Sequence, residues 1–451
     1  MHQILPKSLF PLAKSLPSPL FVVGGAVRDF LAGFSCERPD WDICAPLSAD
    51  EFAQAAQSHG FSVKAVYRNT GTVKLSDADG VTFEYACFRS DKYVRGVHVP
   101  TEIFFTDDVV LDAKRRDFTA NAVYYNIEKQ TFVDPLNGIE AIREKRLSTV
   151  APAQKVFSED GLRLLRLARQ AAQLGFTPDE ECKRGATENA ALIADISPER
   201  IFTELELLLL ADEKFGVTGG AYNGLKLLEE IGVLAKILPE LTQGKGMKQR
   251  ADFHNHDVLE HSLRAVKYAP PSIRLAALLH DVGKPFCTLR DGNTHKHPIE
   301  GEILAKAILC RLKAPKKTTE RVCELIRWHM YDLDGKTSEK KLRKFFVQNK
   351  HILEELLLLK QADFSACKDN LNPAPTCVRW HVLLEKMQKE NTPFTLRQLA
   401  VNGKDLLALN IPPAHVSTLL QALLMHTAIF PSDNEKYRLL SLVLGMEKDL
   451  I

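Results

Sequence analysis

Apolar and polar positions alternate in short runs over the first 150 residues, and the runs are separated by turns rich in glycine, asparagine and aspartate. Runs with a period of two and many β-branched or aromatic residues predict strands, whereas helical spacing predicts helices. The predicted strands are residues 21–23, 63–66, 71–75 and 81–88, and the predicted helices are residues 26–32 and 51–59. A mixed domain of strands and helices is therefore expected at the N-terminus.

The pattern changes to helical at residue 158 and remains so to the C-terminus, with proline or glycine breaks. Ser158 is the expected N-cap of the first of these helices. A set of charged residues then recurs every three positions and stays near one helix face: Asp160, Arg163, Arg166 and Arg169. Asp160 and Arg163 form either an ordinary surface ion pair or a donor–acceptor set that pairs with the edge of a nucleobase.

A glycine turn and two aspartates follow the first predicted strand. Gly24 and Gly25 allow backbone N–H groups to approach a phosphate, and Arg28 lies in the first turn of the next helix. Asp40 and Asp42 are two residues apart in a predicted strand, so both carboxylates share one face. Such carboxylates repel unless a cation lies between them, and Mg²⁺ prefers oxygen ligands. Solvated aspartates are the alternative, but the combination indicates a nucleoside triphosphate and metal site.

Further polar residues extend this candidate site. Glu84 points away from the apolar face of its predicted strand, so it either reaches the same cleft or is a solvated outer residue. Residues 90–112 are long, polar and weakly patterned, as functional or disordered loops are. Three cations and an aspartate follow: Lys114, Arg115, Arg116 and Asp117. This set suggests phosphate clamping, with a solvated basic turn as the alternative.

A second polar group lies in the helical part of the chain. Residues 254–281 contain His261 and end in the adjacent pair His280 and Asp281, before a turn at Gly283. Further members follow downstream: His297, His329 and Asp363. Imidazole and carboxylate together suit transition metals and Mg²⁺. A lone interior histidine is usually a hydrogen-bonded core residue, but this accumulation favours a metal site.

Composition restricts the possible fold and function classes only slightly. The chain has 451 residues, 45% apolar and 26% charged, which is ordinary for a globular protein of several domains. No apolar run is long enough to span a membrane, and nine cysteines without a CxxC pair are typical of reduced cytoplasmic thiols. A net charge of +2 does not indicate a nucleic-acid partner, so RNA would need a local basic face. Basic clusters at residues 313–317 and 339–343 are either solvated or line an RNA backbone.

An ordered series of motifs resembles the class II tRNA nucleotidyltransferases, the CCA-adding enzymes, which share a head with bacterial poly(A) polymerases. In chain order the motifs are GGAVRD at 24–29, DWD at 40–42, RRDFTANA at 115–122, DPLNG at 134–138, EDGLR at 159–163 and SPER at 197–200. The series is far more specific than any single motif. The resemblance covers nearly the whole chain and is strongest over residues 21–205.

This resemblance implies an α+β fold, with a mixed β-sheet, polymerase-β-like head followed by an all-α neck, body and tail. The implied domains are a nucleotidyltransferase head at 1–150, a neck at 151–245 with the nucleobase-selecting motif, an HD-type domain at 246–365 and a tRNA-binding tail at 366–451. Residues 401–406 resemble the family's tail element, whereas 412–417 depart from its Gly-Pro-x-x-Gly segment. How the tail holds tRNA is therefore not implied.

The implied function is template-independent addition of C, C and A, or part of CCA, to the tRNA 3′ end from CTP and ATP in the cytoplasm. Asp40 and Asp42, with Glu84 as a third ligand, would hold two Mg²⁺ ions between the primer hydroxyl and the α-phosphate. The other implied nucleotide-binding residues are Gly24, Gly25, Arg28, Arg115, Arg116, Asp117, Asp160, Arg163, Arg166 and Arg169. Asp160 and Arg163 would select C and A. No membrane and no obligate protein partner is implied.

Three further implications bear on specificity. Residues 90–112 lie where CCA- and A-adding members keep a flexible loop that CC-adding members shorten, which disfavours CC-only addition. Four residues match the H…HD…D order of the HD phosphohydrolase superfamily, which binds Mn²⁺, Ni²⁺ or Mg²⁺: His261, His280, Asp281 and Asp363. Two rivals remain: a poly(A) polymerase, which EDGLR disfavours, and an HD phosphohydrolase acting on RNA ends, which the intact DWD and RRD motifs disfavour.

Overall fold

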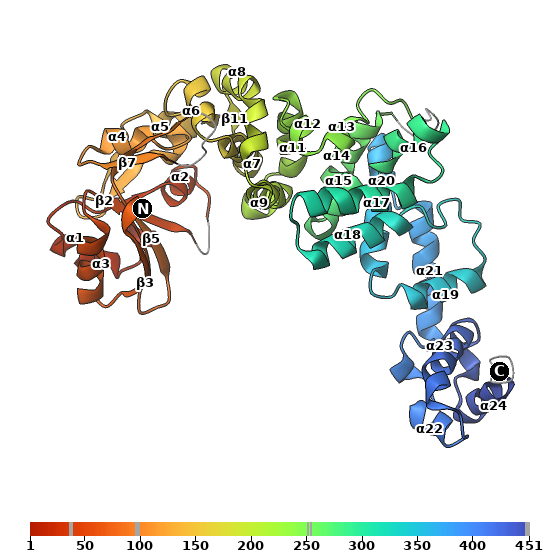
Figure 1. Cartoon of the computed structure of the whole chain (residues 1–451). Helices are drawn as coiled ribbons and strands as arrows, with labels where there is room; N and C mark the ends of the chain where they lie inside the picture. The colour runs from red at the N-terminus through yellow and green to blue at the C-terminus, as the bar shows by residue number, and fades with distance from the viewer. Residues whose placement is uncertain (36–38, 95–99, 250–251, 253–254, 447–451) are drawn as a thin grey trace. The chain divides into compact units, whose positions relative to one another are not determined.

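The computed structural model describes residues 1–35, 39–94, 100–249, 252 and 255–446. The chain forms two compact units (Figure 1), which are described separately. Unit 1 comprises Met1–Thr242 with Arg311–Ala314, and unit 2 comprises Gln243–Cys310 with Pro315–Ile451. The finer division into four domains stays a prediction.

A seven-stranded mixed sheet forms the N-terminal part of unit 1 (Figure 1). Its order is β3-β4-β5-β2-β1-β8-β9, and the β2–β5 pair is parallel whereas the other pairs are antiparallel. The strands are β1 (Phe21–Val23), β2 (Trp41–Ala45), β3 (Ser62–Tyr67), β4 (Thr72–Ser76), β5 (Thr82–Cys87), β8 (Tyr124–Asn126) and β9 (Thr131–Val133). The mixed sheet that the sequence predicts is therefore confirmed.

The two faces of the sheet have different coverings. Helix α3 (Ala49–Ser58) packs on one face, where the ring of Phe52 stacks on Tyr85 at a centroid distance of 3.6 Å. The opposite face carries a buried cluster that includes Phe21, Cys44 and Tyr124. Because side chains alternate along a strand, Asp42 lies on the face opposite to its buried neighbours Trp41 and Ile43.

Residues 90–112 do not form the unstructured loop that their polar composition suggests. They contribute to strands β6 (Arg89–Lys92) and β7 (Glu102–Phe105), which pair antiparallel, and to helix α4 (Val109–Lys114). Backbone pairing holds the two strands together, and one exposed ion pair crosses them, with Lys92 Nζ 2.8 Å from Glu102 Oε1. β6 is polar and β7 is a short apolar run after Glu102, so neither strand shows alternation in the sequence. Residues 95–99 are outside the described residues.

The expected helix start at Ser158 is wrong. Ser158 lies inside α6 (Ala153–Glu159), and the next helix, α7 (Leu162–Leu174), begins after Gly161. A Cβ on Gly161 would lie only 2.7 Å from the carbonyl oxygen of Leu192, so this residue packs where no side chain fits. Asp160 Oδ1 instead accepts a hydrogen bond from the Leu162 amide at 3.0 Å and satisfies the start of α7.

The rest of unit 1 is helical apart from a short parallel pair, β10 (Arg146–Leu147) with β11 (Thr177–Pro178), which the sequence did not predict. Two-residue strands are too short to leave a period in the sequence. The remaining helices are α1 (Leu9–Ser15), α2 (Gly25–Leu31), α5 (Gly138–Arg143), α8 (Glu180–Glu188), α9 (Pro198–Leu209), α10 (Ala211–Phe215), α11 (Gly220–Glu230), α12 (Leu234–Ile237) and α13 (Pro239–Thr242).

Unit 2 is all helical in its described residues. Its helices are α14 (Val258–Tyr268), α15 (Arg274–Leu279), α16 (Gly283–Asp291), α17 (His297–Arg311, whose last residue belongs to unit 1), α18 (Lys316–Trp328), α19 (Glu339–Gln348), α20 (Leu353–Lys368), α21 (Pro375–Lys389), α22 (Gly403–Leu407), α23 (Pro413–Ile429) and α24 (Lys436–Met446). Helices α14, α15, α18 and α20 pack together. None of the described helices is both long and apolar enough to cross a membrane.

Candidate functional site

The glycine turn lies directly against one of the two predicted metal ligands. Gly24 connects β1 to α2 with a positive φ of 80°, a conformation that glycine adopts without strain. A Cβ at Gly24 would stand 3.0 Å from Asp42 Oδ2 and 3.8 Å from a guanidinium nitrogen of Arg116. The turn therefore leaves room for backbone to approach a ligand beside Asp42.

Three carboxylates gather around this turn. Asp42 and Glu84 are register partners on the parallel strands β2 and β5, and Asp40 immediately precedes β2 instead of lying within it, because Pro39 interrupts the extended run. Burial raises the pKa of Asp42 to about 6; Arg116 opposes this rise, whereas Glu84 and Asp40 add to it. A cation would relieve this repulsion, so oxygen ligands and electrostatics both fit a hard divalent ion such as Mg²⁺.

Glu84 is less well placed than the aspartates to bind a cation. Its carboxylate lies 3.6 Å from Lys74 Nζ, and both side chains are about half exposed. Among the described residues, Asp40, Asp42 and Glu84 do not bring three ligand atoms within 4.8 Å of one another. Glu84 as a third ligand therefore stays a prediction.

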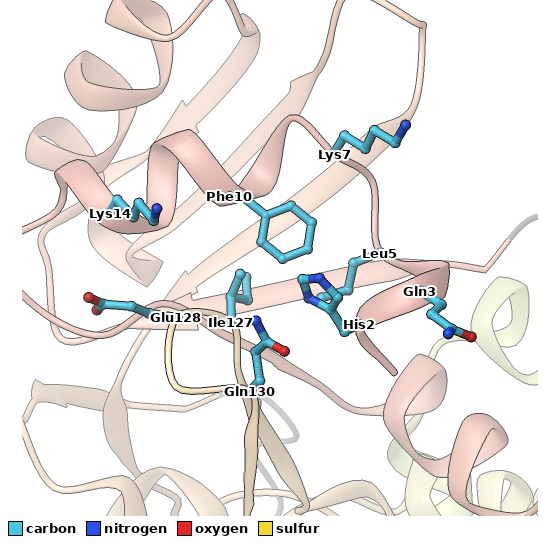
Figure 2. A pocket seen from close by; sticks show the side chains of 9 residues that line it. All are labelled: His2, Gln3, Leu5, Lys7, Phe10, Lys14, Ile127, Glu128 and Gln130. Carbon is cyan, nitrogen blue, oxygen red and sulfur yellow. The ribbon is translucent and has the colours of Figure 1, made fainter.

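A pocket of about 290 Å³ adjoins Asp40, and its lining includes Gly25, Asp29, Phe34 and Lys214 but neither Asp42 nor Glu84. The larger pocket of about 480 Å³ in Figure 2 lies elsewhere in unit 1, between the N-terminal residues around His2 and Phe10 and the turn around Ile127. It contains none of the predicted site residues.

Asp112 holds the two arginines of the basic motif. Its buried carboxylate accepts from Arg115 Nε at 2.7 Å, from an Arg116 amino group at 3.3 Å and from the Tyr124 hydroxyl at 2.6 Å. Burial alone would raise the pKa of Asp112, but the two arginines hold it below its usual value. Sequence reasoning missed this residue, although its spacing of three and four residues from the arginines is a recognisable helical ion-pair pattern.

Asp117 is buried and paired, rather than open to a nucleotide. It accepts from Arg166 Nε at 2.8 Å, from Asn121 Nδ2 at 2.8 Å and from the Phe118 amide at 2.8 Å. Burial alone would raise the pKa of Asp117, but Arg166 and these hydrogen bonds hold this pKa well below its usual range. Asp117 thus joins the basic motif to helix α7.

Arg28 enters the same buried network. Its guanidinium donates to Asn121 Oδ1 at 2.7 Å and to Gln170 Oε1 at 3.3 Å. Gln170 also accepts from Asn121 Nδ2 at 3.0 Å, so one amide links the glycine motif, the basic motif and α7. Gln170 was not predicted, because a single glutamine on a helix carries no recognisable pattern.

The predicted nucleobase-reading residues lie at the start of α7 but do not pair with each other. Asp160 Oδ2 lies 3.5 Å from Arg200, whereas the buried Arg163 pairs with Glu159 at 2.9 Å and donates to the Arg115 carbonyl at 2.9 Å. The simple Asp160–Arg163 surface pair is therefore wrong. The last residue of the set, Arg169, pairs with Glu204 of α9 at 2.6 Å.

The histidines and aspartates of unit 2 converge in a buried centre. His261 comes from α14, His280 and Asp281 follow α15, and Asp363 comes from α20. His261 Nε2 lies 3.0 Å from Asp363 Oδ1, 3.2 Å from His280 Nε2 and 3.5 Å from Asp281 Oδ2. His254, which the sequence placed near this group, is outside the described residues.

The donor set of this centre fits a divalent metal. Burial opposes a charged imidazole, yet Asp281 and Asp363 raise the pKa of His280 to about 10, so the carboxylates favour a cation here. The present counter-cation is Lys284, whose Nζ lies 2.6 Å from Asp281 Oδ2. Burial raises the pKa of Cys367, also nearby, to about 12 and keeps it a thiol instead of a thiolate ligand.

Comparison with known proteins identifies three family domains along the chain. Residues 20–148 match the family described as "Poly A polymerase head domain", residues 175–244 the one described as "Probable RNA and SrmB- binding site of polymerase A", and residues 258–364 the "HD domain". The chain is also similar in fold to the Bacillus stearothermophilus CCA-adding enzyme in complex with CTP. That similarity has a TM-score of 0.67 and 23% identity, and it covers 99% of each chain.

Two curated relatives are similar over most of their length. An A-adding tRNA nucleotidyltransferase of Deinococcus radiodurans is 31% identical over 79% of this chain and 79% of its own. A CC-adding tRNA nucleotidyltransferase of Thermus thermophilus is 31% identical over 87% of this chain and 85% of its own. Because identity and coverage are this high over both chains, the protein belongs to the tRNA nucleotidyltransferase family.

Proposed function

We propose that the protein adds C, C and A to the 3′ end of tRNA, using CTP and ATP and a two-metal site in the head. The observation that carries the proposal is the carboxylate group beside the Gly24 turn, where burial and like charges raise the pKa of Asp42 to about 6. Asp40 and Asp42 would hold Mg²⁺, which supplies charge neutralisation at the transferred phosphate when bound. The expected cytoplasmic location belongs to this proposal.

Two groups of residues would bind the incoming nucleotide, one contacting its phosphates and the other its base. Gly24 and Gly25 leave space for the triphosphate, and Arg116 places positive charge next to that turn. Asp160 and Arg163 would read the incoming base, because Asp160 is partly accessible and Arg163 is held rigidly by Glu159. Positioning and charge stabilisation are most of what nucleotidyl transfer requires from a protein.

We propose addition of the full CCA sequence, and not addition of A alone or of CC alone. Relatives include A-adding and CC-adding enzymes of equal identity, so relationship alone does not decide between them. The β6–β7 hairpin gives this chain a long insert at the position that CC-adding members shorten. Its Tyr93 ring lies 5.7 Å from the Arg163 guanidinium, which supports a role for this insert beside the base-reading residues.

A runoff assay with purified tRNA tests this proposal. Transcripts ending before CCA, after the first C, and after CC are each incubated with CTP alone, ATP alone or both. Full CCA addition predicts two C residues with CTP alone and completion only when ATP is present. Extension by A alone only on the transcript ending in CC would establish A-adding activity instead, and long A tails would establish a poly(A) polymerase.

A second candidate function is carried by the buried centre of unit 2. We propose that His261, His280, Asp281 and Asp363 bind one divalent ion and support hydrolysis of phosphate esters, for example a 2′,3′-cyclic phosphate at a damaged tRNA end. The four donors face one point from three helical segments. Mn²⁺, Ni²⁺ and Mg²⁺ are the ions to test.

Phosphatase and cyclic phosphodiesterase assays with each ion decide this second function. The wild type is compared with Asp281→Ala, and the exposed His295→Ala serves as the matched control. Metal-dependent hydrolysis that only Asp281→Ala removes is expected. Equal activity in all three proteins, or no activity in any, contradicts the proposal.

A further inference from the structure

We propose that the pocket in Figure 2 is a second nucleotide-binding site, which holds the base and phosphate of one nucleoside phosphate outside the catalytic centre. None of its lining residues belongs to the candidate carboxylate site. Its volume of about 480 Å³ lies within the range of about 300–1,000 Å³ that is typical of small-molecule sites. Binding there does not require the proposed nucleotide addition, and no role of this pocket follows from that function.

The apolar part of the pocket offers aromatic rings. Two buried side chains, Leu5 and Ile127, and the half-buried Phe10 supply its apolar surface. The Phe10 ring lies at the centre of the pocket, next to the His2 ring at a centroid distance of 4.6 Å (Figure 2). Bases of unpaired nucleotides stack on such rings, because every base has a flat π-face. This part of the pocket therefore fits a base.

Two cations border the same rings. Lys7 and Lys14 line the pocket, and neither side chain forms an ion pair with a residue that the structure describes. The lining contains a single carboxylate, that of Glu128. Ammonium groups bind phosphate through their charge and their donated hydrogen bonds. Exposed lysines alone would indicate only a solvated face, but a nucleotide requires the combination of cation and ring that this pocket provides.

A strained main chain brings an amide to the pocket. Gln130 lies in the turn between β8 and β9 with a φ of 54°, a left-handed conformation that glycine adopts more readily. Asn126 Oδ1 holds this turn by accepting from the Lys129 amide at 2.9 Å. Gln130 lines the pocket together with Gln3, and each amide both donates and accepts, as the edge of a base does. A glutamine at a position suited to glycine indicates a role for its side chain.

One short segment contributes to this pocket and to the pocket beside Asp40. The 3-10 helix η1 (His2–Ile4) provides His2 and Gln3 to the pocket in Figure 2, whereas its last residue, Ile4, lines the pocket beside Asp40. A ligand that holds His2 also restricts Ile4, because the residues of one helical turn move together. Occupation of the second site is therefore expected to change nucleotide affinity at the catalytic centre.

Photocrosslinking locates the ligand without depending on activity. Full-length protein is irradiated with 5-iodouridine 5′-monophosphate in the presence of a chelator, and labelled peptides are identified by mass spectrometry. Label within residues 1–14 or 124–131 is expected, and AMP or CMP should displace it whereas inorganic phosphate at the same concentration should not. A single-stranded RNA with the same iodinated base distinguishes two sources of the ligand. Stronger labelling by the RNA identifies an unpaired RNA nucleotide, and equal or weaker labelling identifies a free nucleotide.

Three variants test the ring, the charge and the amide separately: Phe10→Leu, Lys14→Gln and Gln130→Gly. Glycine suits the left-handed turn position, so Gln130→Gly removes the amide without straining the fold. Each variant is expected to weaken labelling by about fivefold or more. Lys129→Gln, which removes an exposed cation of the same turn outside the lining, is the control and should label as the wild type does.

The KM for CTP tests the connection to the catalytic centre. It is measured with and without AMP, whose competition at the catalytic centre is the same in the wild type and in Gln130→Gly. The KM of the wild type is expected to respond to AMP about fivefold more or less strongly than that of the variant. An identical response in both proteins overturns the connection and leaves the second site in place.

Label confined to other peptides, or displaced equally well by inorganic phosphate, overturns the nucleotide site. Equal loss of label in Lys14→Gln and Lys129→Gln overturns it as well, because it would show general attraction of charge. Labelling at the pocket in a protein that adds no nucleotide to tRNA supports the second site and contradicts the proposed function alone.

Discussion

At the scale of single residues, Asp42 combines the features that a catalytic metal ligand needs. It is half-buried, adjoins a glycine turn with positive φ and shares its surroundings with two other carboxylates. A carboxylate in such a place is destabilised in the absence of a cation, because burial and like charge both oppose ionisation. Its ionised form is therefore coupled to metal binding.

Replacing Asp42 by Asn is expected to reduce nucleotide addition by about 100-fold or more, because the amide keeps the volume but loses the charge that holds the ions. The measurement is single-turnover incorporation with saturating tRNA and CTP. Asp79→Asn, an exposed aspartate in the same domain, is the control. tRNA affinity should remain near that of the wild type, and wild-type incorporation by Asp42→Asn would contradict the metal role.

Asp160 offers a sharper test of base choice than removal of the side chain. Asparagine keeps the side-chain oxygen that accepts from the Leu162 amide, so Asp160→Asn preserves the start of α7 while it replaces the second carboxylate oxygen with an amide donor. Incorporation of UTP or GTP relative to CTP and ATP is expected to rise, because hydrogen-bond reading contributes most of such discrimination. Ser158→Ala, in the last turn of α6, is the control; a lower total rate with unchanged misincorporation would assign Asp160 a structural role.

Sequence motifs identify the candidate site residues, but they do not predict the side-chain contacts that these residues make. Asp117, Arg166 and Arg28 belong to recognisable motifs, yet in the folded chain Asp117 pairs with Arg166, whereas Arg28 pairs with Asp29 and donates to Asn121. The contacts with Arg166 and Asn121 join residues many positions apart, which no local period records. Asp112, by contrast, has a local ion-pair spacing to the two arginines that could have identified it, whereas Gln170 carries no recognisable pattern.

At the scale of elements, the contacts between the basic motif and α7 connect the two parts of the candidate site. The Asp117–Arg166 pair and the hydrogen bonds of Gln170 connect a turn after α4 to the helix that begins at Leu162. The residues proposed to read the base, at the start of that helix, are thereby connected to the turn proposed to bind phosphate. Rigid placement of both groups is what template-independent selection requires.

Asp117→Asn is expected to lower the unfolding free energy by about 1–3 kcal/mol at pH 7, since it leaves Arg166 without its buried partner. The pKa of Asp117 is depressed in the fold, so its stabilisation is present above the usual Asp pKa near 3.9 and is lost as pH falls below it. The measurement is urea unfolding at pH 7 and pH 4, with Asp79→Asn as the control. A wild-type-minus-variant difference that grows at pH 4 would contradict this assignment.

Element boundaries show where sequence reasoning stops. The strands β3, β4 and β5 and helix α3 lie within a few residues of their predicted positions, because alternation and a Ser48 cap record them locally. The start of α7 was misplaced because Gly161 is set by its contact with Leu192, which lies 31 positions further on. The β6–β7 hairpin was missed because neither strand alternates apolar and polar residues: β6 is polar and β7 is a short apolar run after Glu102.

At the scale of the whole molecule, two chemical centres lie in two compact units that fold around separate cores. The proposed carboxylate site would use oxygen ligands alone, whereas the proposed centre in unit 2 would mix imidazole with carboxylate. These donor sets favour different metals, so the two centres can be loaded and removed separately. A cyclic phosphate at a tRNA end blocks the hydroxyl that nucleotide addition requires, so the proposed activities would act in succession on one substrate.

The two activities are therefore expected to separate by mutation in both directions. Asp42→Ala should lose nucleotide addition and keep metal-dependent cyclic phosphodiesterase activity, whereas Asp281→Ala should do the reverse. Both variants are assayed on the same tRNA, once ending in a cyclic phosphate and once in a free hydroxyl, with Mn²⁺ or Ni²⁺ for hydrolysis and Mg²⁺ for addition. Ring opening at the 3′ P–O bond leaves a 2′-phosphate and a free 3′-hydroxyl, and phosphatase action then releases the 2′-phosphate as inorganic phosphate. On the cyclic-phosphate tRNA, only the wild type should therefore yield extended product, and mixing the two variants should restore it. Loss of both activities in either single variant, despite a wild-type circular dichroism spectrum, would show that the centres are not independent.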